Sequence, residues 1–187
     1  FTGPVQFNLG RSLHKVDLKR IKGTGAFASG EGKANKTFRE EYILSYSLVG
    51  FYGIINENAA KITNLTQGDI NLLIEGMWNG TKNLISRSKV GQLPRLLIKV
   101  NYKEENYHIG GLLKKISLNK NVDDEAIRSP KDYNVDLSEL SCCIEKNKEK
   151  IESIEYIIDD ELVLELDGKE IDIKDAIKNI DIKELEI

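Results

Sequence analysis

The stretch Ser86-Arg-Ser-Lys-Val-Gly-Gln92 places two cations, two hydroxyl groups and a side-chain amide within one short segment. These groups suit contact with phosphate, because Lys and Arg attract it and Ser and Gln can hydrogen-bond it. A basic cluster of this kind is more often a solvated loop. The residues alone leave both interpretations open for Ser86, Arg87, Ser88, Lys89, Gly91 and Gln92.

Further cations precede a glycine-rich segment near the start of the chain. They are Arg11, Lys15, Arg20 and Lys22. Residues 23–36 then contain four glycines and one large apolar side chain, Phe27, with Lys33 and Lys36 close by. This composition predicts a loop. An aromatic side chain on such a loop either packs as tolerated surface or stacks on a base, and both readings stay open.

Residues that commonly carry catalysis or bind metals are few. His14 and His108 are the only histidines and lie far apart in the sequence, so we predict no metal site and no cofactor. Cys142 and Cys143 are adjacent, which disfavours a disulfide and predicts reduced thiols. The glycine-rich segment lacks the ending of a nucleotide-binding phosphate loop. No apolar run approaches the roughly 20 residues of a membrane-spanning helix, and we expect a cytoplasmic protein.

Charge divides the chain into two unequal parts. Residues 1–100 hold 14 Lys and Arg against 7 Asp and Glu, which leaves 13 basic and 23 acidic residues for 101–187. The first part is therefore +7 and the second −10. This split predicts that the first part meets a polyanion, while the second stays solvated or contacts a basic neighbour.

Periodicity predicts the elements that would position these residues. Alternation indicates a strand over 3–9 and a long hairpin formed by 11–22 and 38–55. Helices are expected over 56–62 and 66–81, the second with a capping box, an apolar stripe in the core and two glycines packed closely against a sheet. A strand over 93–102 completes an α+β sandwich with helices on one face of an antiparallel sheet.

The pattern weakens after Lys103. Residues 119–150 have poor periodicity and many charges, which predicts a linker or irregular excursion. A β-hairpin around Asp167-Gly168 and a short helix capped by Asp172 are expected near the end.

Three segments together resemble the backbone subunit of type I CRISPR Cascade, in particular its type I-B branch, a RAMP superfamily member. The segments are Phe1-Thr-Gly-Pro-Val-Gln-Phe-Asn-Leu-Gly-Arg-Ser-Leu-His-Lys15, Tyr46-Ser-Leu-Val-Gly-Phe-Tyr-Gly-Ile-Ile-Asn56 and Ser86–Gln92. The resemblance covers residues 1 to about 118. Family members carry an N-terminal strand and helix that this sequence lacks, so we expect further sequence before Phe1.

The resemblance implies a modified RRM-like, ferredoxin-like palm at 1–118, with residues 23–36 as the tip of a thumb. It leaves 119–187 as an acidic extension. It also implies a non-catalytic protein that binds guide RNA (crRNA) without reading bases and forms a helical filament of its own copies. Other Cascade subunits and a DNA target, reached through the guide, would be its partners. The cations, Phe27 and the 86–92 loop would then form a continuous RNA groove.

Two other functions remain as alternatives. A RAMP-type endoribonuclease would need an acid-base group, for which His14 and Glu31 are the candidates near the basic region. A pure interaction module would work through the acidic second part.

Overall fold

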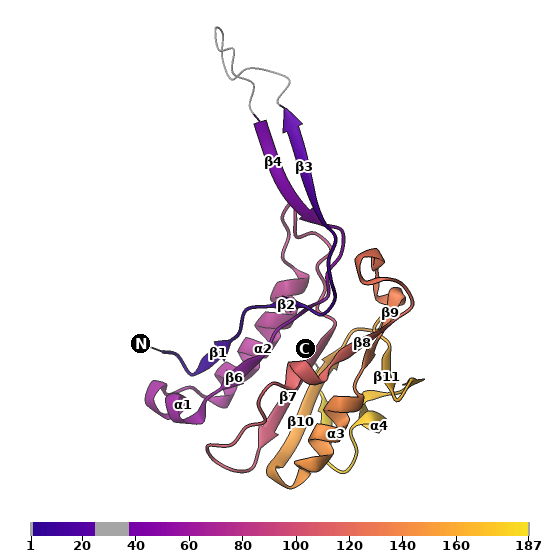
Figure 1. Cartoon of the computed structure of the whole chain (residues 1–187). Helices are drawn as coiled ribbons and strands as arrows, with labels where there is room; N and C mark the ends of the chain where they lie inside the picture. Colours follow the sequence, from indigo (N-terminus) through magenta and orange to yellow (C-terminus); the bar gives the residue numbers. More distant parts are fainter. Residues whose placement is uncertain (1, 25–37, 187) are drawn as a thin grey trace.

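The computed structural model describes residues 2–24 and 38–186. These residues form a mixed α+β structure, which confirms the predicted class (Figure 1). The strands are β1 (Val5–Phe7), β2 (Arg11–Ser12), β3 (Leu18–Thr24), β4 (Phe38–Leu44), β5 (Val49–Gly50), β6 (Gly53–Ile55), β7 (Leu96–Tyr102), β8 (Ser117–Lys120), β9 (Tyr133–Asp136), β10 (Ile151–Ile158), β11 (Leu164–Leu166), β12 (Lys169–Glu170) and β13 (Asp181–Glu184). The helices are α1 (Glu57–Thr63), α2 (Gln67–Lys82), α3 (Ser138–Lys146) and α4 (Ile173–Ala176), with short 3-10 turns at Leu112–Lys115, Asp124–Ala126, Pro130–Asp132 and Lys148–Lys150.

The described strands pair into several small sheets. Three have two antiparallel strands each, namely β1–β6, β2–β5 and β3–β4. The others have the orders β13-β10-β7 and β12-β11-β9-β8, and each contains one parallel pair, β10 with β13 and β9 with β11. Several of these sheets therefore pair short strands that lie far apart in the sequence.

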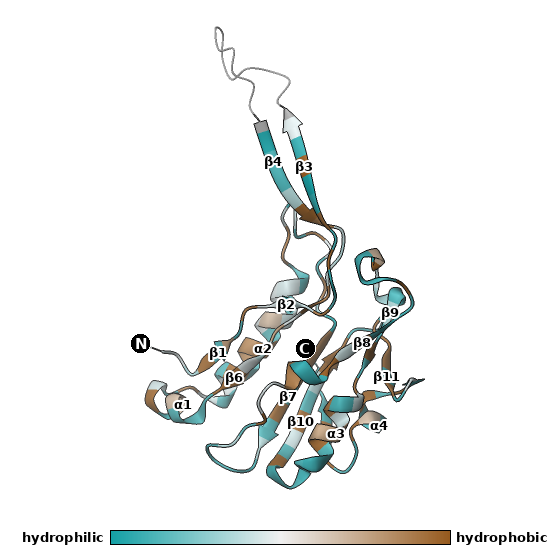
Figure 2. Cartoon of the chain, viewed as in Figure 1, coloured by the Kyte–Doolittle hydropathy of each residue, from teal (hydrophilic) through white to brown (hydrophobic). Residues whose placement is uncertain are grey.

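The predicted long hairpin is confirmed. Strands β3 and β4 pair from Leu18 opposite Leu44 to Thr24 opposite Phe38, and the ribbon projects away from the body (Figure 1). Figure 2 shows hydrophilic and hydrophobic residues along both strands. The predicted tip residues, Phe27, Lys33 and Lys36, lie outside the described residues.

The two predicted helices are present, and the second has its predicted capping box. The Oδ1 atom of Asn56 accepts hydrogen bonds from the first free amides of α1, those of Asn58 at 2.9 Å and Ala59 at 3.1 Å. Thr66 and Asp69 form the capping box of α2. Both caps satisfy amides that have no partner within their helix, which fixes where each helix starts.

The prediction that the α2 stripe lies in the core is wrong in part. Ile74 is its only buried member, and Thr81 is exposed. The prediction of close packing at Gly76 and Gly80 is also wrong, since an added Cβ would meet no atom within 4 Å at either position.

The main core lies in the second part of the chain. Its buried side chains come from β9, β10, β11, α3 and α4 and the segments beside them. Ile127, Tyr133, Leu137, Leu140 and Ile144 belong to it and are at most 1% exposed. The linker prediction for 119–150 is therefore wrong. Strand β7 pairs with β10, so one sheet joins the two parts.

Candidate nucleic-acid interface

The 86–92 segment is an exposed loop made of tight turns. The carbonyl of Ser86 accepts from the amides of Lys89 at 3.1 Å and Val90 at 3.2 Å, and Gln92 donates its amide to the carbonyl of Lys89 at 3.3 Å. Gly91 stands third in that last turn with φ of 84°, a backbone conformation that favours glycine. The side chains of the loop face solvent. The turns therefore present them together on a short, ordered segment.

Arg87 brings this loop against the hairpin. Its guanidinium forms an ion pair with Glu41 of β4, and Glu41 also pairs with Arg39. The Arg87 side chain remains 67% exposed. An exposed pair of this kind contributes little to stability, but it shows that the 86–92 loop and β4 lie side by side.

The hairpin presents cations on both of its faces. Residues opposite one another in an antiparallel pair share a face, and faces alternate along each strand. Arg20 and Lys22 share one face with Glu40, whose carboxylate lies 2.6 Å from Arg20 and 3.8 Å from Lys22. The other face carries Arg39 and Glu41. The contact between Glu41 and Arg87 therefore lies on that face too. The prediction of one continuous groove is wrong in this respect, because a ribbon necessarily divides neighbouring side chains between two surfaces.

The remaining predicted cations lie near the base of the hairpin. Arg11 is exposed in β2, opposite Gly50 of β5. Lys15 turns toward another surface, where its ammonium lies 2.7 Å from Glu125.

His14 is a structural residue in this fold. Its ring is 7% exposed, and Nε2 accepts the amide of Leu48 at 3.3 Å. An accepting Nε2 places the ring proton on Nδ1, which donates to the carbonyls of Lys15 at 2.8 Å and Asp124 at 3.2 Å. Both nitrogens are thus hydrogen-bonded to the backbone, and the side chain is buried.

Sequence reasoning missed three residues of this surface. Glu41 and Arg39 alternate with Glu40 and Phe38 at the start of β4, a pattern that could have placed them on the Arg87 side. Tyr42, 61% exposed, lies opposite Arg20 and offers a ring on which a base can stack.

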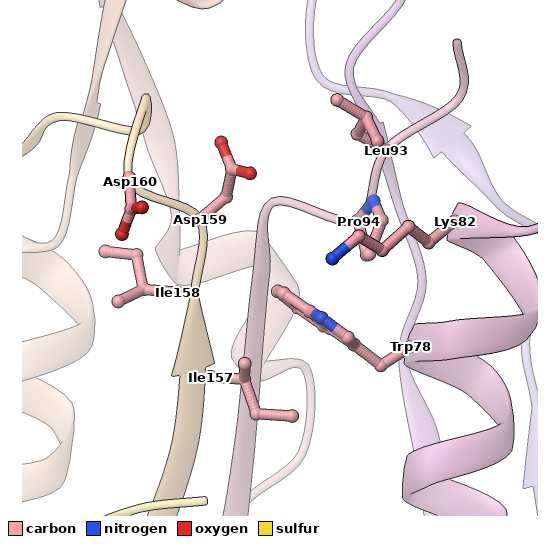
Figure 3. A pocket seen from close by; sticks show the side chains of 8 residues that line it. All are labelled: Trp78, Lys82, Leu93, Pro94, Ile157, Ile158, Asp159 and Asp160. Carbon is pink, nitrogen blue, oxygen red and sulfur yellow. The ribbon is translucent and has the colours of Figure 1, made fainter. Parts of the chain in front are cut away.

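Two hollows lie elsewhere. One of about 180 Å³ separates α2 from the end of β10, with Trp78 and Lys82 on one side and Ile157, Asp159 and Asp160 on the other (Figure 3). It is smaller than an ordinary small-molecule site of roughly 300 Å³ or more. The other, about 580 Å³, lies among β10, β11 and β12 with Asp160, Glu170, Asp172 and Glu184 exposed around it. Four carboxylates make that surface unsuited to RNA.

Comparison with known families decides where the chain belongs. The family model described as CRISPR-associated protein Cas7 matches residues 1–138. The chain belongs to the Cas7 family. The match extends past residue 118 through β9 to Ser138, the first residue of α3, so Cas7 family sequence covers the first part of the segment predicted as a linker.

A CRISPR-associated protein Cas7 of Haloferax volcanii is 35% identical to this chain over 170 residues. The alignment covers 89% of this chain and 50% of the relative, so the chain spans about half the length of that Cas7 protein. A chain of a solved CRISPR RNA-guided surveillance complex, pre-nicking, is similar with a TM-score of 0.46 and 13% identity, covering 85% of this chain and 44% of that one.

Within residues 2–24 and 38–186, no helix is long and apolar enough to cross a membrane. The described His, Cys, Asp and Glu side chains form no group of three that could hold a metal ion. Cys142 and Cys143 are both free thiols, as predicted.

Proposed function

We propose that this Cas7 family chain binds the sugar-phosphate backbone of CRISPR guide RNA without reading its sequence, as the repeating backbone subunit of a type I Cascade complex. The observation that carries the proposal is the contact between Arg87 and Glu41. It joins the basic 86–92 loop to the hairpin, the two segments in which the sequence concentrates phosphate-binding side chains. A guide carries a different spacer each time, so its carrier must grip phosphate and ribose.

The RNA strand contacts the hairpin on both faces as it crosses the ribbon. On one face it meets Arg39 together with the 86–92 loop, and on the other it meets Arg20, Lys22 and Tyr42. Arg11 and Lys15 add positive charge near the base, and Phe27, Lys33 and Lys36 extend the contact beyond the described residues. The hairpin thereby acts as a thumb on an RRM-like, ferredoxin-like palm formed within 1–118. Residues 119–187 form an acidic extension that supports this palm from beside the RNA path.

The chain holds RNA and does not cleave it. The engagement of both His14 nitrogens supports this view over the endoribonuclease alternative. Copies that each cover an equal length of guide meet head to tail in a helical filament, because a closed symmetric dimer could not follow an extended strand. Other Cascade subunits bind at the filament ends, and a DNA target is reached through base pairing with the guide.

The test uses two unrelated single-stranded RNAs of equal length, titrated at several salt concentrations. Both should bind with similar affinity, remain uncut in divalent metal, and weaken steeply with salt. Arg87→Ala with Lys89→Ala should weaken the binding of both RNAs roughly tenfold. It should also flatten the slope of log affinity against log salt concentration by about 1.4, or about 0.7 for each lost phosphate contact. Lys169→Ala with Lys178→Ala, which removes two exposed cations from the acidic part, is the matched control. Binding of only one RNA, or metal-dependent cleavage abolished by His14→Ala or Glu31→Ala, would overturn the proposal.

A further inference from the structure

The base of the hairpin is attached to the segment that follows β8. The backbone amide of Lys15, just before β3, donates to Oδ2 of Asp124 at 2.9 Å. The carbonyl of Asp124 accepts from His14 at 3.2 Å, so one residue holds two consecutive positions of the hairpin base. Nearby, Arg128 lies 3.6 Å from the Asp17 carboxylate. These contacts join positions more than a hundred residues apart in the sequence, as the separation of 109 between Lys15 and Asp124 illustrates.

Asp124 is itself held in place. Its second carboxylate oxygen, Oδ1, lies 2.5 Å from the ammonium of Lys120 at the end of β8. Lys120 and the Lys15 amide together lower the pKa of Asp124, which favours the ionised form that accepts both hydrogen bonds. The next residues lead into Ile127, which is fully buried in the core. Asp124 therefore links the hairpin base to a part of the chain that cannot shift freely.

The other strand of the hairpin has an attachment of its own. Tyr46, two residues beyond β4, shares a 2.8 Å hydroxyl hydrogen bond with Tyr133, which is fully buried at the start of β9. The Tyr46 ring also stacks on His14, with ring centroids 6.1 Å apart. Both ends of the hairpin are thus tied to the core through 123–133.

An isolated two-stranded ribbon has little stability of its own, and its direction depends on how its base is held. We propose that Asp124 and Tyr133 are positioning residues, which fix the direction of the hairpin and so keep its cations beside the 86–92 loop. The effect on the hairpin is independent of the function proposed above, whereas the effect on RNA affinity rests on it.

An electrostatic role and a positioning role of Asp124 predict opposite changes in RNA affinity when its charge is removed. If its charge acted only by repelling phosphate, Asp124→Asn would bind RNA more tightly. A positioning role predicts weaker binding with an unchanged salt slope, since no phosphate contact is lost. Tyr133→Phe removes one hydroxyl without changing charge, so electrostatics predict no effect for it. Asp123→Asn is the matched control, because Asp123 is exposed and adjacent and its side chain does not cap the Asp124–Ala126 turn.

The experiment measures amide hydrogen exchange and RNA affinity of the full chain carrying Asp124→Ala, Asp124→Asn, Tyr133→Phe or Asp123→Asn. Asp124→Ala and Tyr133→Phe should speed exchange in β3 and β4 several-fold, leave β10 unchanged, and lower RNA affinity about threefold or more at constant salt slope. Asp124→Asn keeps an acceptor oxygen, so its hairpin exchange rate and its RNA affinity should lie between those of Asp124→Ala and wild type.

Unchanged hairpin exchange in Tyr133→Phe, whose volume is nearly conserved, would overturn the inference. So would Asp124→Asn binding RNA as tightly as Asp123→Asn. If wild type binds no RNA, the proposed function fails, and hairpin exchange still decides whether these two residues set its position.

Discussion

Arg87, in the loop after α2, pairs with Glu41 of β4 across a sequence separation of 46 residues. Glu41 also holds Arg39, and Glu40 holds Arg20 and Lys22 on the opposite face. These four cations, which are proposed to bind phosphate, are thus paired with carboxylates when RNA is absent. Phosphate and carboxylate compete for the same guanidinium groups, since both accept bidentate hydrogen bonds from Arg.

This competition predicts the effect of neutralising Glu41. Glu41→Gln should raise RNA affinity about two- to fivefold and steepen its salt dependence, because Arg87 and Arg39 become available to phosphate and one repulsive charge is lost. Filter binding or fluorescence anisotropy over a salt series measures both quantities. Glu75→Gln, on the exposed side of α2, removes an equal charge and should change affinity less. Equal effects of the two variants would refute a specific role for the pair.

Substitution of glycine by alanine should act differently at two positions. At Gly91 the positive φ disfavours a side chain by about 1 kcal/mol, so Gly91→Ala should disturb the loop turn and weaken RNA binding several-fold.

At Gly76 in α2 an added methyl meets open space, and alanine should stabilise the helix by about 0.8–1 kcal/mol. Thermal unfolding should then rise by roughly 2–4 °C without a change in RNA affinity. A lower melting temperature for Gly76→Ala would show that this reading of α2 is mistaken.

Local patterns in the sequence predicted the local structure well. The alternation of Val5 and Phe7, the pairing of the long hairpin and the capping box of Thr66 and Asp69 depend on neighbouring residues, which the sequence displays directly. The exposed basic loop at 86–92 was recognisable for the same reason. Its contact with Glu41 was not, because periodicity carries no information on which distant segment a loop meets.

The segment 119–150 was misread because its elements are short. Strand β9 has four residues and α3 has nine, and 3-10 turns separate them, so no long periodic window exists. Two signals were nevertheless present. Leu137, Leu140 and Ile144 have helical spacing, and Ser129 with Asp132 forms a capping box. The parallel pairing of β10 with β13 depends on contacts that no local pattern encodes.

The position of the core predicts where apolar truncation is costly. Leu140 is 1% exposed in α3, so Leu140→Ala should lower the free energy of unfolding by about 2–5 kcal/mol. Leu72 in α2 is 67% exposed, and Leu72→Ala should change it by less than about 0.5 kcal/mol. Urea denaturation distinguishes the two. A small effect of Leu140→Ala would contradict a core centred on the second part of the chain.

Asp136 links acid stability to the start of α3. Ser138 donates its hydroxyl at 2.5 Å and its amide at 2.8 Å to Oδ1 of Asp136, and these bonds lower the pKa of Asp136 from its ordinary value of 3.8. A carboxylate with a lowered folded-state pKa contributes stability above its unfolded pKa, and that contribution is lost as pH falls through the folded value.

Asp136→Asn should therefore reduce the free energy of unfolding by about 1 kcal/mol at about pH 6, and by less at about pH 2.5, because the stabilisation by the wild-type carboxylate declines as pH falls below its unfolded pKa toward the lowered folded value. Chemical denaturation at the two pH values tests this. A difference between wild type and variant that grows in acid would contradict the assignment.

The central claim is that RNA lies along the hairpin and the 86–92 loop, away from the acidic surface of the second part. Ultraviolet cross-linking of a bound single-stranded RNA, followed by mass spectrometry of the attached peptides, tests it most directly. The account predicts cross-links within 11–24, 38–44 and 86–92, with Tyr42 among the modified residues. Cross-links concentrated between Ile151 and Glu184 would contradict it.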